Sequence, residues 1–240
     1  MKLFTALTFF AASCLNAQEV APHPSKGLRY GDDIAKFVAA DKATPPPQNA
    51  LLIVGSSSAR YWVSATDDFK PYPVINRGFG GSKTSEVLAY MDQITLPYHP
   101  RVVIYFAGTN DLGGGAKAED VLQNIQEYVK RLRAENPNCG VVIMSALKAP
   151  RRKAQWEEFD KFNTLVEKFC ASGKNLYFAN HNPAMNKPNG EPNTELYQEE
   201  GNTAMHANAA GYVQIAKIVR PIVDQAWKAS DPSVSETTKK

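Results

Sequence analysis

Five apolar runs of strand length occur along the chain, and segments with helical periodicity separate them. Nearly every residue in these runs is apolar, which is typical of strands that are buried on both faces. The pattern therefore predicts an α/β fold in which a five-stranded parallel sheet lies between two layers of helices. The runs span Leu51–Gly55, Pro73–Asn76, Val102–Ala107, Gly140–Ser145 and Asn175–Ala179.

Two helices are the clearest between and after these runs. In the segment Ala118–Glu135, apolar residues recur at positions i, i+4, i+8 and i+11 and so share one helix face. The last helix is expected to begin at Asn208, a favourable N-cap residue, and to bend at Pro221. The polar residues 230–240 that follow it are expected to form a disordered tail.

The first 17 residues are typical of a secretory signal peptide. A single Lys precedes an apolar run from Leu3 to Ala12, which is too short to span a bilayer, and small residues then lead to a cleavage site near Ala17. We therefore expect an exported protein, either periplasmic or secreted. An alternative is lipidation at Cys14, although Ala11 stands where a lipobox usually has Leu.

Residues 18–49 form a polar, proline-bearing extension that we expect to pack on the domain. It contains a short amphipathic segment near Asp32 to Ala40 and ends in Pro45-Pro46-Pro47. The domain itself is expected to span residues 50–229.

Composition and charge narrow the function classes. The chain has 240 residues, 43% of them hydrophobic, which is enough for one domain with a substantial core. The formal net charge is only +3 and forms no basic stripe, so we expect no nucleic-acid partner. After the signal peptide, no stretch is apolar enough to cross a membrane. The oligomeric state is left open.

Two cysteines, Cys139 and Cys170, remain after the signal peptide. In an exported protein they favour a disulfide, with two buried free thiols as the alternative. No CxxC sequence or cluster of Cys and His is present, so we predict neither a metal site nor a cofactor.

Polar and glycine-rich segments follow the predicted strands, at the edge where parallel sheets bind ligands. Ser57 enters a helix after the first strand, Gly80 and Gly81 follow the second, and Asn110 follows the third. His206 lies just before the last helix. These residues supply a nucleophile, a base and donors to an oxyanion, which are the parts that acyl transfer needs. Each segment alone is commonplace, and only the combination at one edge indicates a site.

Other motifs fit poorly. Residues Gly55 to Ala59 lack the last glycine of the GxSxG elbow. The chain has no GxxxxGK sequence, and the glycines from Gly78 to Gly81 do not have dinucleotide-binding spacing. His181, at the end of the fifth run, is a rival base that we favour less than His206.

Taken together, the segments LLIVGSSSARYW, NRGFGGS, FAGTNDL and HANAAGY resemble, in order, the four blocks of the SGNH (GDSL-like) hydrolases. The resemblance covers about Ala50 to Trp227. It implies a flavodoxin-like, doubly wound α/β/α fold and hydrolysis of an acyl or acetyl ester on a lipid or sugar. It also implies Ser57 as nucleophile, Gly81 and Asn110 in the oxyanion hole, and His206 as base.

The chain departs from the family pattern at two positions. Ser56 replaces the usual Asp of the first block, which leaves the nucleophile in place in a Gly-Ser-Ser-Ser variant. Thr203 stands three residues before the base, where the family has its acid. We expect Glu200 to replace this acid and Glu199 to matter little. The alternatives are a solvated Glu200 and a Ser–His pair aided by a backbone carbonyl.

Two other functions remain as alternatives. A non-catalytic module that binds carbohydrate or another ligand on the same fold would explain the missing acid at position 203. A flavin- or phosphate-binding flavodoxin-like protein is supported by the expected fold alone, and fold does not imply function.

Overall fold

The computed structural model of the chain describes residues 29–231. The predicted signal peptide, Cys14 and residues 232–240 lie outside this range. The tail predicted for residues 230–240 therefore lies mostly outside the described residues, and only Ser230 and Asp231 of it are described. Ser230 is buried against Ala226, and the Asp231 carboxylate lies 2.9 Å from the Arg101 guanidinium.

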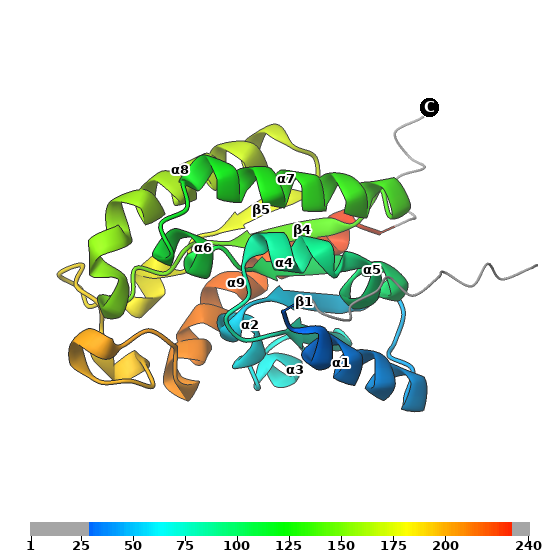
Figure 1. Cartoon of the computed structure of the whole chain (residues 1–240), viewed down its shortest axis with the longest axis horizontal. Helices are drawn as coiled ribbons and strands as arrows, with labels where there is room; N and C mark the ends of the chain where they lie inside the picture. Colours follow the sequence, from blue (N-terminus) through cyan, green and yellow to red (C-terminus); the bar gives the residue numbers. More distant parts are fainter. Residues whose placement is uncertain (1–28, 232–240) are drawn as a thin grey trace, which may run out of the picture.

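A five-stranded, all-parallel sheet forms the centre of the fold in the order β2-β1-β3-β4-β5, which confirms the predicted flavodoxin-like α/β architecture (Figure 1). In the register, Gly55 at the end of β1 lies opposite both Gly78 of β2 and Phe106 of β3. The carboxyl ends of these three neighbouring strands are therefore level. The strands are β1 (Leu51–Gly55), β2 (Val74–Gly78), β3 (Val102–Phe106), β4 (Gly140–Met144) and β5 (Leu176–Ala179).

The second strand differs most from its prediction, because it continues past Asn76 to Gly78. It lies at the edge of the sheet, where only one neighbouring strand pairs with it, and only Ile75 and Gly78 of its five residues are buried. Polar residues such as Arg77 are therefore tolerated in it. An apolar run alone could not reveal where this strand ends.

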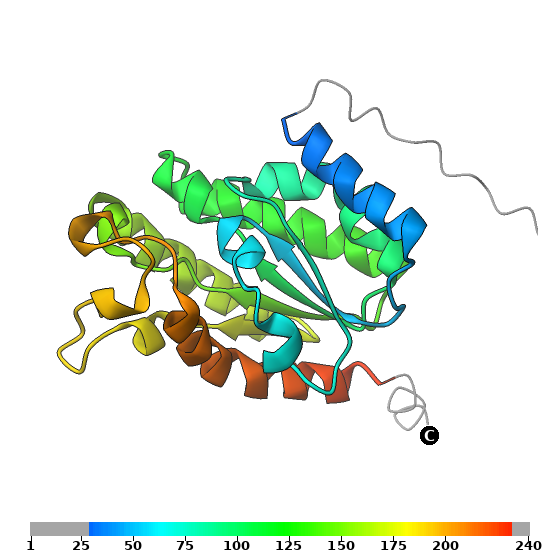
Figure 2. The same cartoon turned by 90° about the horizontal axis from the view of Figure 1, so that it is seen from below.

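Helices cover both faces of the sheet, as Figure 2 shows. One face carries α1 (Gly31–Ala43), α4 (Thr84–Ala89), α5 (Met91–Ile94), α7 (Ala118–Glu135) and α8 (Trp156–Ser172). The other carries α3 (Ala65–Asp68) and α9 (Ala209–Ala229). At the carboxyl edge lie α2 (Ser57–Arg60) and α6 (Thr109–Gly113). Short 3₁₀ helices span Leu96–Tyr98, Pro150–Gln155, Asn182–Met185, Thr194–Leu196 and Gly201–Thr203.

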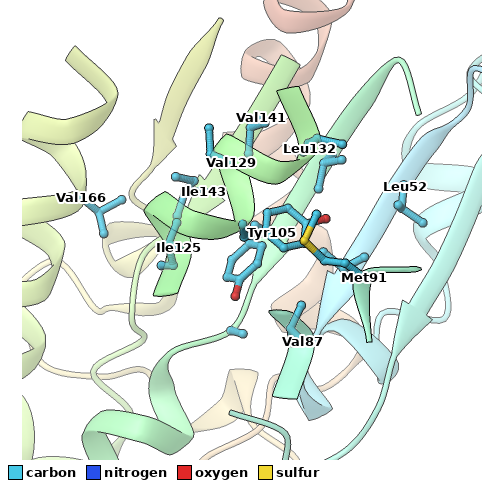
Figure 3. Packing of buried hydrophobic residues seen from close by; sticks show 14 of the residues in the cluster. Leu52, Val87, Met91, Tyr105, Ile125, Val129, Leu132, Val141, Ile143 and Val166 are labelled. Atoms are coloured by element: carbon cyan, nitrogen blue, oxygen red, sulfur yellow. The ribbon is translucent and has the colours of Figure 1, made fainter. Parts of the chain in front are cut away.

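The side chains of each central strand alternate between two apolar clusters, one on each face of the sheet. Leu52 of β1 packs with α4, α5 and α7 on the first face, and Figure 3 shows it beside Val87 and Met91. Its neighbours Leu51 and Ile53 pack under α9 on the other face. The apolar stripe predicted for α7 is confirmed, since all four of its residues are buried there: Val121, Ile125, Val129 and Leu132.

The N-terminal helix α1 packs on this same core through the buried side chain of Ile34. This helix extends beyond the amphipathic segment predicted from Asp32 to Ala40, because it ends at Ala43. Near its end, Asp41 pairs with Arg77 of β2 and accepts a hydrogen bond from the Tyr98 hydroxyl at 2.6 Å. These polar contacts join α1 to the edge strand of the sheet.

The predicted disulfide between Cys139 and Cys170 is wrong, because both thiols are free and buried. Both side chains belong to the first apolar cluster, and burial raises the pKa of each to about 12. The two segments do lie at neighbouring strands. A disulfide also requires close Cα atoms and converging Cβ bonds, which the order of strands cannot establish.

Candidate active site

Ser57 begins α2 immediately after a sharp turn at the end of β1. Gly55 makes this turn with φ 143°, and a Cβ at this position would lie 2.1 Å from the Phe106 carbonyl oxygen. The next amide, of Ser56, donates to that same oxygen at 3.1 Å. Because only glycine fits so close to β3, the chain can turn at once and leave Ser57 on the first turn of a helix, partly exposed.

The Ser57 hydroxyl lies against the imidazole of His206, with Oγ 3.0 Å from Nε2. The His206 ring also meets the ring of Tyr61 edge to face, with a centroid distance of 5.1 Å. Behind the pair, the Tyr212 hydroxyl donates to the Ser58 carbonyl at 2.8 Å and so joins α9 to α2. The structure therefore brings together two residues that are 149 positions apart in the sequence.

The carboxylate that contacts His206 belongs to Glu199, so the choice of Glu200 is corrected. Oε1 of Glu199 lies 2.5 Å from His206 Nδ1, while Oε2 accepts the backbone N–H groups of His206 and Met205 at 2.9 and 3.0 Å. Glu200 is exposed, and only its backbone carbonyl is engaged, by Thr203. Thr203 itself makes no contact with His206.

A short antiparallel pairing explains why Glu199 takes this position. Tyr197 forms a β-bridge with Ala207, and the Gln198 amide donates to the His206 carbonyl at 2.8 Å. Successive side chains of an extended segment point to opposite sides, so only one of two adjacent glutamates can face the imidazole. Residues 200–205 form the connection of this hairpin, so the Glu199 carboxylate contacts the His206 ring although the two residues are seven positions apart.

The environment of Glu199 keeps its carboxylate ionised. Burial alone would raise its pKa, but hydrogen bonds from the His206 amide, the His206 ring and the Met205 amide outweigh burial and lower the pKa to about 2. An ionised carboxylate can only accept, so Nδ1 of His206 carries the proton of this hydrogen bond. In the neutral imidazole, Nε2 is then free to accept the proton of the Ser57 hydroxyl.

Hydrogen bonds through Ser82 join the loops that follow β1, β2 and β3. The Ser82 hydroxyl donates to the Gly55 carbonyl at 3.2 Å, and the Phe79 amide donates to the same carbonyl at 3.0 Å. From the third loop, Asn110 Nδ2 donates to the Ser82 carbonyl at 3.1 Å. The segment that contains Gly81 is therefore held between Ser57 and Asn110.

Several N–H groups in these loops have no hydrogen-bond acceptor among the described residues. Among residues 29–231, the backbone N–H groups of Ser57 and Gly81 donate to no acceptor, and Asn110 Nδ2 uses one of its two hydrogens. All three residues are partly exposed. The arrangement offers a hydroxyl, a base that can take its proton, and free N–H donors on adjacent loops.

Asp111 has a role that the sequence did not reveal. Its carboxylate is buried and accepts the Thr84 amide at 3.0 Å and the Thr84 hydroxyl at 2.7 Å. Burial raises the pKa of Asp111, and the hydrogen bonds from Thr84 oppose that shift. This contact fastens the start of α4 to α6, next to Asn110, and so supports the loop geometry.

The described residues contain neither a metal-binding cluster nor a membrane-spanning helix. No group of three or more His, Cys, Asp or Glu between residues 29 and 231 could hold a metal ion. Within the same range, no helix combines the length and the apolar character that a membrane span requires.

The sequence profile of the GDSL-like lipase/acylhydrolase family matches residues 32–214, which is most of the chain. This chain belongs to that family. Membership makes it an ester hydrolase by class and confirms the resemblance to SGNH hydrolases. A search of curated proteins found no match.

Several solved structures share the fold at low sequence identity. A GDSL-like lipase from Bacteroides thetaiotaomicron is 21% identical, with a TM-score of 0.68 over 81% of this chain and 98% of that one. A carbohydrate esterase of family 3 from Talaromyces cellulolyticus is 15% identical, with a TM-score of 0.59 over 74% and 97%. An acetylxylan esterase from Geobacillus stearothermophilus is 13% identical, with a TM-score of 0.61 over 75% and 97%.

The rival base His181 lies in the core of this hydrolase, away from Ser57. It is fully buried, and its Nδ1 lies 2.9 Å from the hydroxyl of Ser145, which is also buried. Burial lowers the pKa of His181 to about 4, against a smaller opposing effect of the Ala179 backbone. This histidine therefore stays neutral near pH 7 and holds β4 to β5.

His181 should make the fold sensitive to acid. Its folded-state pKa of about 4 lies below the ordinary 6.5, so the unfolded chain binds a proton that the folded chain does not. The free energy of unfolding should fall by up to about 3 kcal/mol as pH drops from about 6.5 to about 4. Urea unfolding measured across this range should show a flatter pH dependence for His181→Asn. The exposed His99 is the control, since His99→Asn should keep the wild-type slope.

Proposed function

We propose that this family member hydrolyses acyl or acetyl esters through Ser57, His206 and Glu199. The observation that carries the proposal is the continuous hydrogen-bonded chain from the Ser57 hydroxyl through the His206 ring to the Glu199 carboxylate. Ser–His–carboxylate arrangements of this kind recur on unrelated folds and are recognised by their geometry.

In the first half of the reaction, the Ser57 oxygen attacks the ester carbonyl while His206 Nε2 takes the hydroxyl proton. Glu199 stabilises the imidazolium that results and keeps Nδ1 protonated, so that Nε2 faces the serine. The tetrahedral intermediate then collapses, the C–O bond to the alcohol breaks, and His206 returns the proton to the leaving oxygen. An acyl group remains on Ser57.

The charge on the intermediate oxygen is held by N–H donors. Candidates are the unused amides of Ser57 and Gly81 and the second hydrogen of Asn110 Nδ2. They require no rearrangement before the reaction, because Ser82 already holds their loops together. In the second half, water attacks the acyl group with His206 again as base, and the free acid leaves.

The substrate class is supported by the relatives. Two of the solved structures with this fold are named as a carbohydrate esterase and an acetylxylan esterase, so we include acetyl esters of sugars among the expected substrates. The alternative of a non-catalytic binding module rested on the missing acid at position 203. The contact of Glu199 with His206 removes that support.

The nucleophile assignment can be tested by paired serine substitutions. Ser57→Ala should abolish turnover of p-nitrophenyl acetate and labelling by a fluorophosphonate probe. Ser58→Ala is the matched control and should keep both, because Ser58 contacts Tyr212 only through its backbone carbonyl. Turnover that survives in Ser57→Ala would show that another residue attacks the ester.

The two adjacent glutamates provide a second test. In Glu199→Gln, the amide oxygen can still accept the backbone N–H groups, but its NH₂ group then faces Nδ1 and favours the wrong imidazole tautomer. In a serine protease the equivalent change costs about 10⁴ in kcat. Here the Glu199 side chain is 30% exposed, so a loss on the order of 100-fold in kcat is expected. Glu200→Gln should stay within about twofold of wild type. Equal effects of the two substitutions would refute the assignment.

Asn110 tests the oxyanion donors. Asn110→Ala should lower kcat by about 10²- to 10³-fold with little change in KM, because the donor acts mainly in the transition state. Asn110→Asp keeps the shape but removes the amide donor, so it should lose at least as much. A change confined to KM in both variants would place Asn110 in ground-state binding instead.

A further inference from the structure

Arg60 ends α2, one helical turn after Ser57. Its guanidinium carbon would lie 2.8 Å from a Cβ on Gly80, the residue next to Gly81 in the loop after β2. One of its nitrogens donates to the Tyr61 hydroxyl at 2.9 Å, and the Tyr61 ring is the one that meets His206. The guanidinium therefore lies next to the loop that we assign to the oxyanion hole, and it is joined through Tyr61 to the histidine that we assign as base.

This positive charge has no counter-charge in the described chain. Among residues 29–231, no carboxylate lies within ion-pair distance of Arg60, whose side chain is exposed and has only the Tyr61 hydroxyl as a polar partner. Nearby carboxylates are already engaged: Glu199 by His206, Asp111 by Thr84, and Glu86 by Arg29 and the Lys83 amide.

Two more cations without an ion-pair partner in residues 29–231 lie on the Asn110 side. The Arg152 guanidinium donates to the Gly113 carbonyl at 3.3 Å, and the Lys83 ammonium would lie 3.8 Å from a Cβ on Gly114. Both glycines closely follow Asn110 in the chain. Lys83 also lies close enough to the Asp111 carboxylate to lower its pKa, so the excess of positive charge at the site comes from Arg60 and Arg152.

We propose that Arg60 binds an anionic group of the substrate, so that the preferred ester carries a carboxylate or a phosphate close to the bond that is cut. This inference rests on the proposed function and names its substrate class. An arginine presents five N–H donors in a planar fork that matches the oxygens of a carboxylate or phosphate. Tyr61 holds one nitrogen, and the remaining donors are available to a ligand.

Gly80 has a specific part in this site. A side chain there would collide with the guanidinium, whose carbon and two terminal nitrogens all lie within 3.0 Å of the Cβ position. The absence of a side chain lets the flat face of Arg60 rest on the loop backbone. That contact and the Tyr61 hydroxyl fix the orientation of the group before any ligand binds, which reduces the entropy cost of binding.

Two pairs of esters test the proposal, and in each pair one member carries an anionic group that the other lacks. The first pair places a carboxylate in the acyl part, with p-nitrophenyl hemiglutarate against p-nitrophenyl pentanoate. The second places a phosphate in the alcohol part, with acetylglycerol phosphate against monoacetylglycerol. The kcat/KM of each ester is measured for wild type, Arg60→Gln, Arg60→Lys and Lys217→Gln. Lys217 is the control for net charge, since it lies on α9 and its ammonium contacts Gln214.

Wild type should prefer the charged member of at least one pair, and the pair concerned shows which anion is bound. Arg60→Gln should lower that preference by about 10- to 100-fold, the range expected for the loss of a charge-assisted hydrogen bond. Arg60→Lys should keep part of the preference, and Lys217→Gln should keep all of it. For wild type, 0.5 M NaCl should also weaken the preference, because salt screens exposed charges.

The proposal fails if wild type prefers the neutral ester in both pairs. It also fails if Arg60→Gln changes both members of each pair by the same factor. If Arg60→Gln does not fold, the Arg60→Lys and salt measurements still decide. None of these results affects the proposed function, which fails only if neutral esters are not hydrolysed or if hydrolysis survives in Ser57→Ala.

Discussion

The close approach of backbones at the carboxyl ends of β1, β2 and β3 is the constraint on which the site depends. Gly55 lies opposite Gly78 and Phe106, and its turn brings the Ser56 amide onto the Phe106 carbonyl. The Gly55 carbonyl in turn accepts donors from the loop after β2. Because no Cβ fits at Gly55, the Ser57 turn can lie close to β3, and hydrogen bonds of Ser82 join it to the Gly81 and Asn110 loops.

A short antiparallel pairing positions the Glu199 carboxylate. The pairing of residues 196–198 with 206–208 places Glu199 beside the His206 ring, and it also presents two backbone N–H groups to the carboxylate. Asn208 contributes from both sides of this hairpin. Its side chain caps α9 through the Gly211 amide and donates to the Tyr197 carbonyl. The start of α9, His206 and Glu199 are therefore positioned by one local network.

The carboxylates and the cations around this network differ in how they are paired. The carboxylates near the site each hold a loop or a ring: Asp111 fastens α4 to α6, and Glu199 orients His206. Arg60 and Arg152, by contrast, form no ion pair with any carboxylate among residues 29–231, and their hydrogen bonds go to the Tyr61 hydroxyl and the Gly113 carbonyl. Because the carboxylates near the site are engaged and these two guanidinium groups form no ion pair, the arrangement favours a negatively charged ligand.

The sequence by itself determined the class of fold and much of the site. Apolar runs and helical stripes depend on local periodicity, so the five strands and α7 could be read from them. The glycine turn before Ser57 is likewise a local signal, and the order of the four motifs was enough to indicate the family and to place Ser57 and His206 together.

Only the tertiary structure decided the features that depend on pairing between segments. Glu199 and Glu200 are equivalent in the sequence, and the hairpin register alone turns one toward His206. Cys139 and Cys170 lie near adjacent strands, yet bond formation needs a side-chain geometry that strand order does not specify. The sequence also did not reveal that the Arg60 guanidinium lies next to Gly80 and Tyr61. This position depends on how close the loop after β2 comes to α2. Distances between segments are set by packing, and no local pattern of residues encodes them.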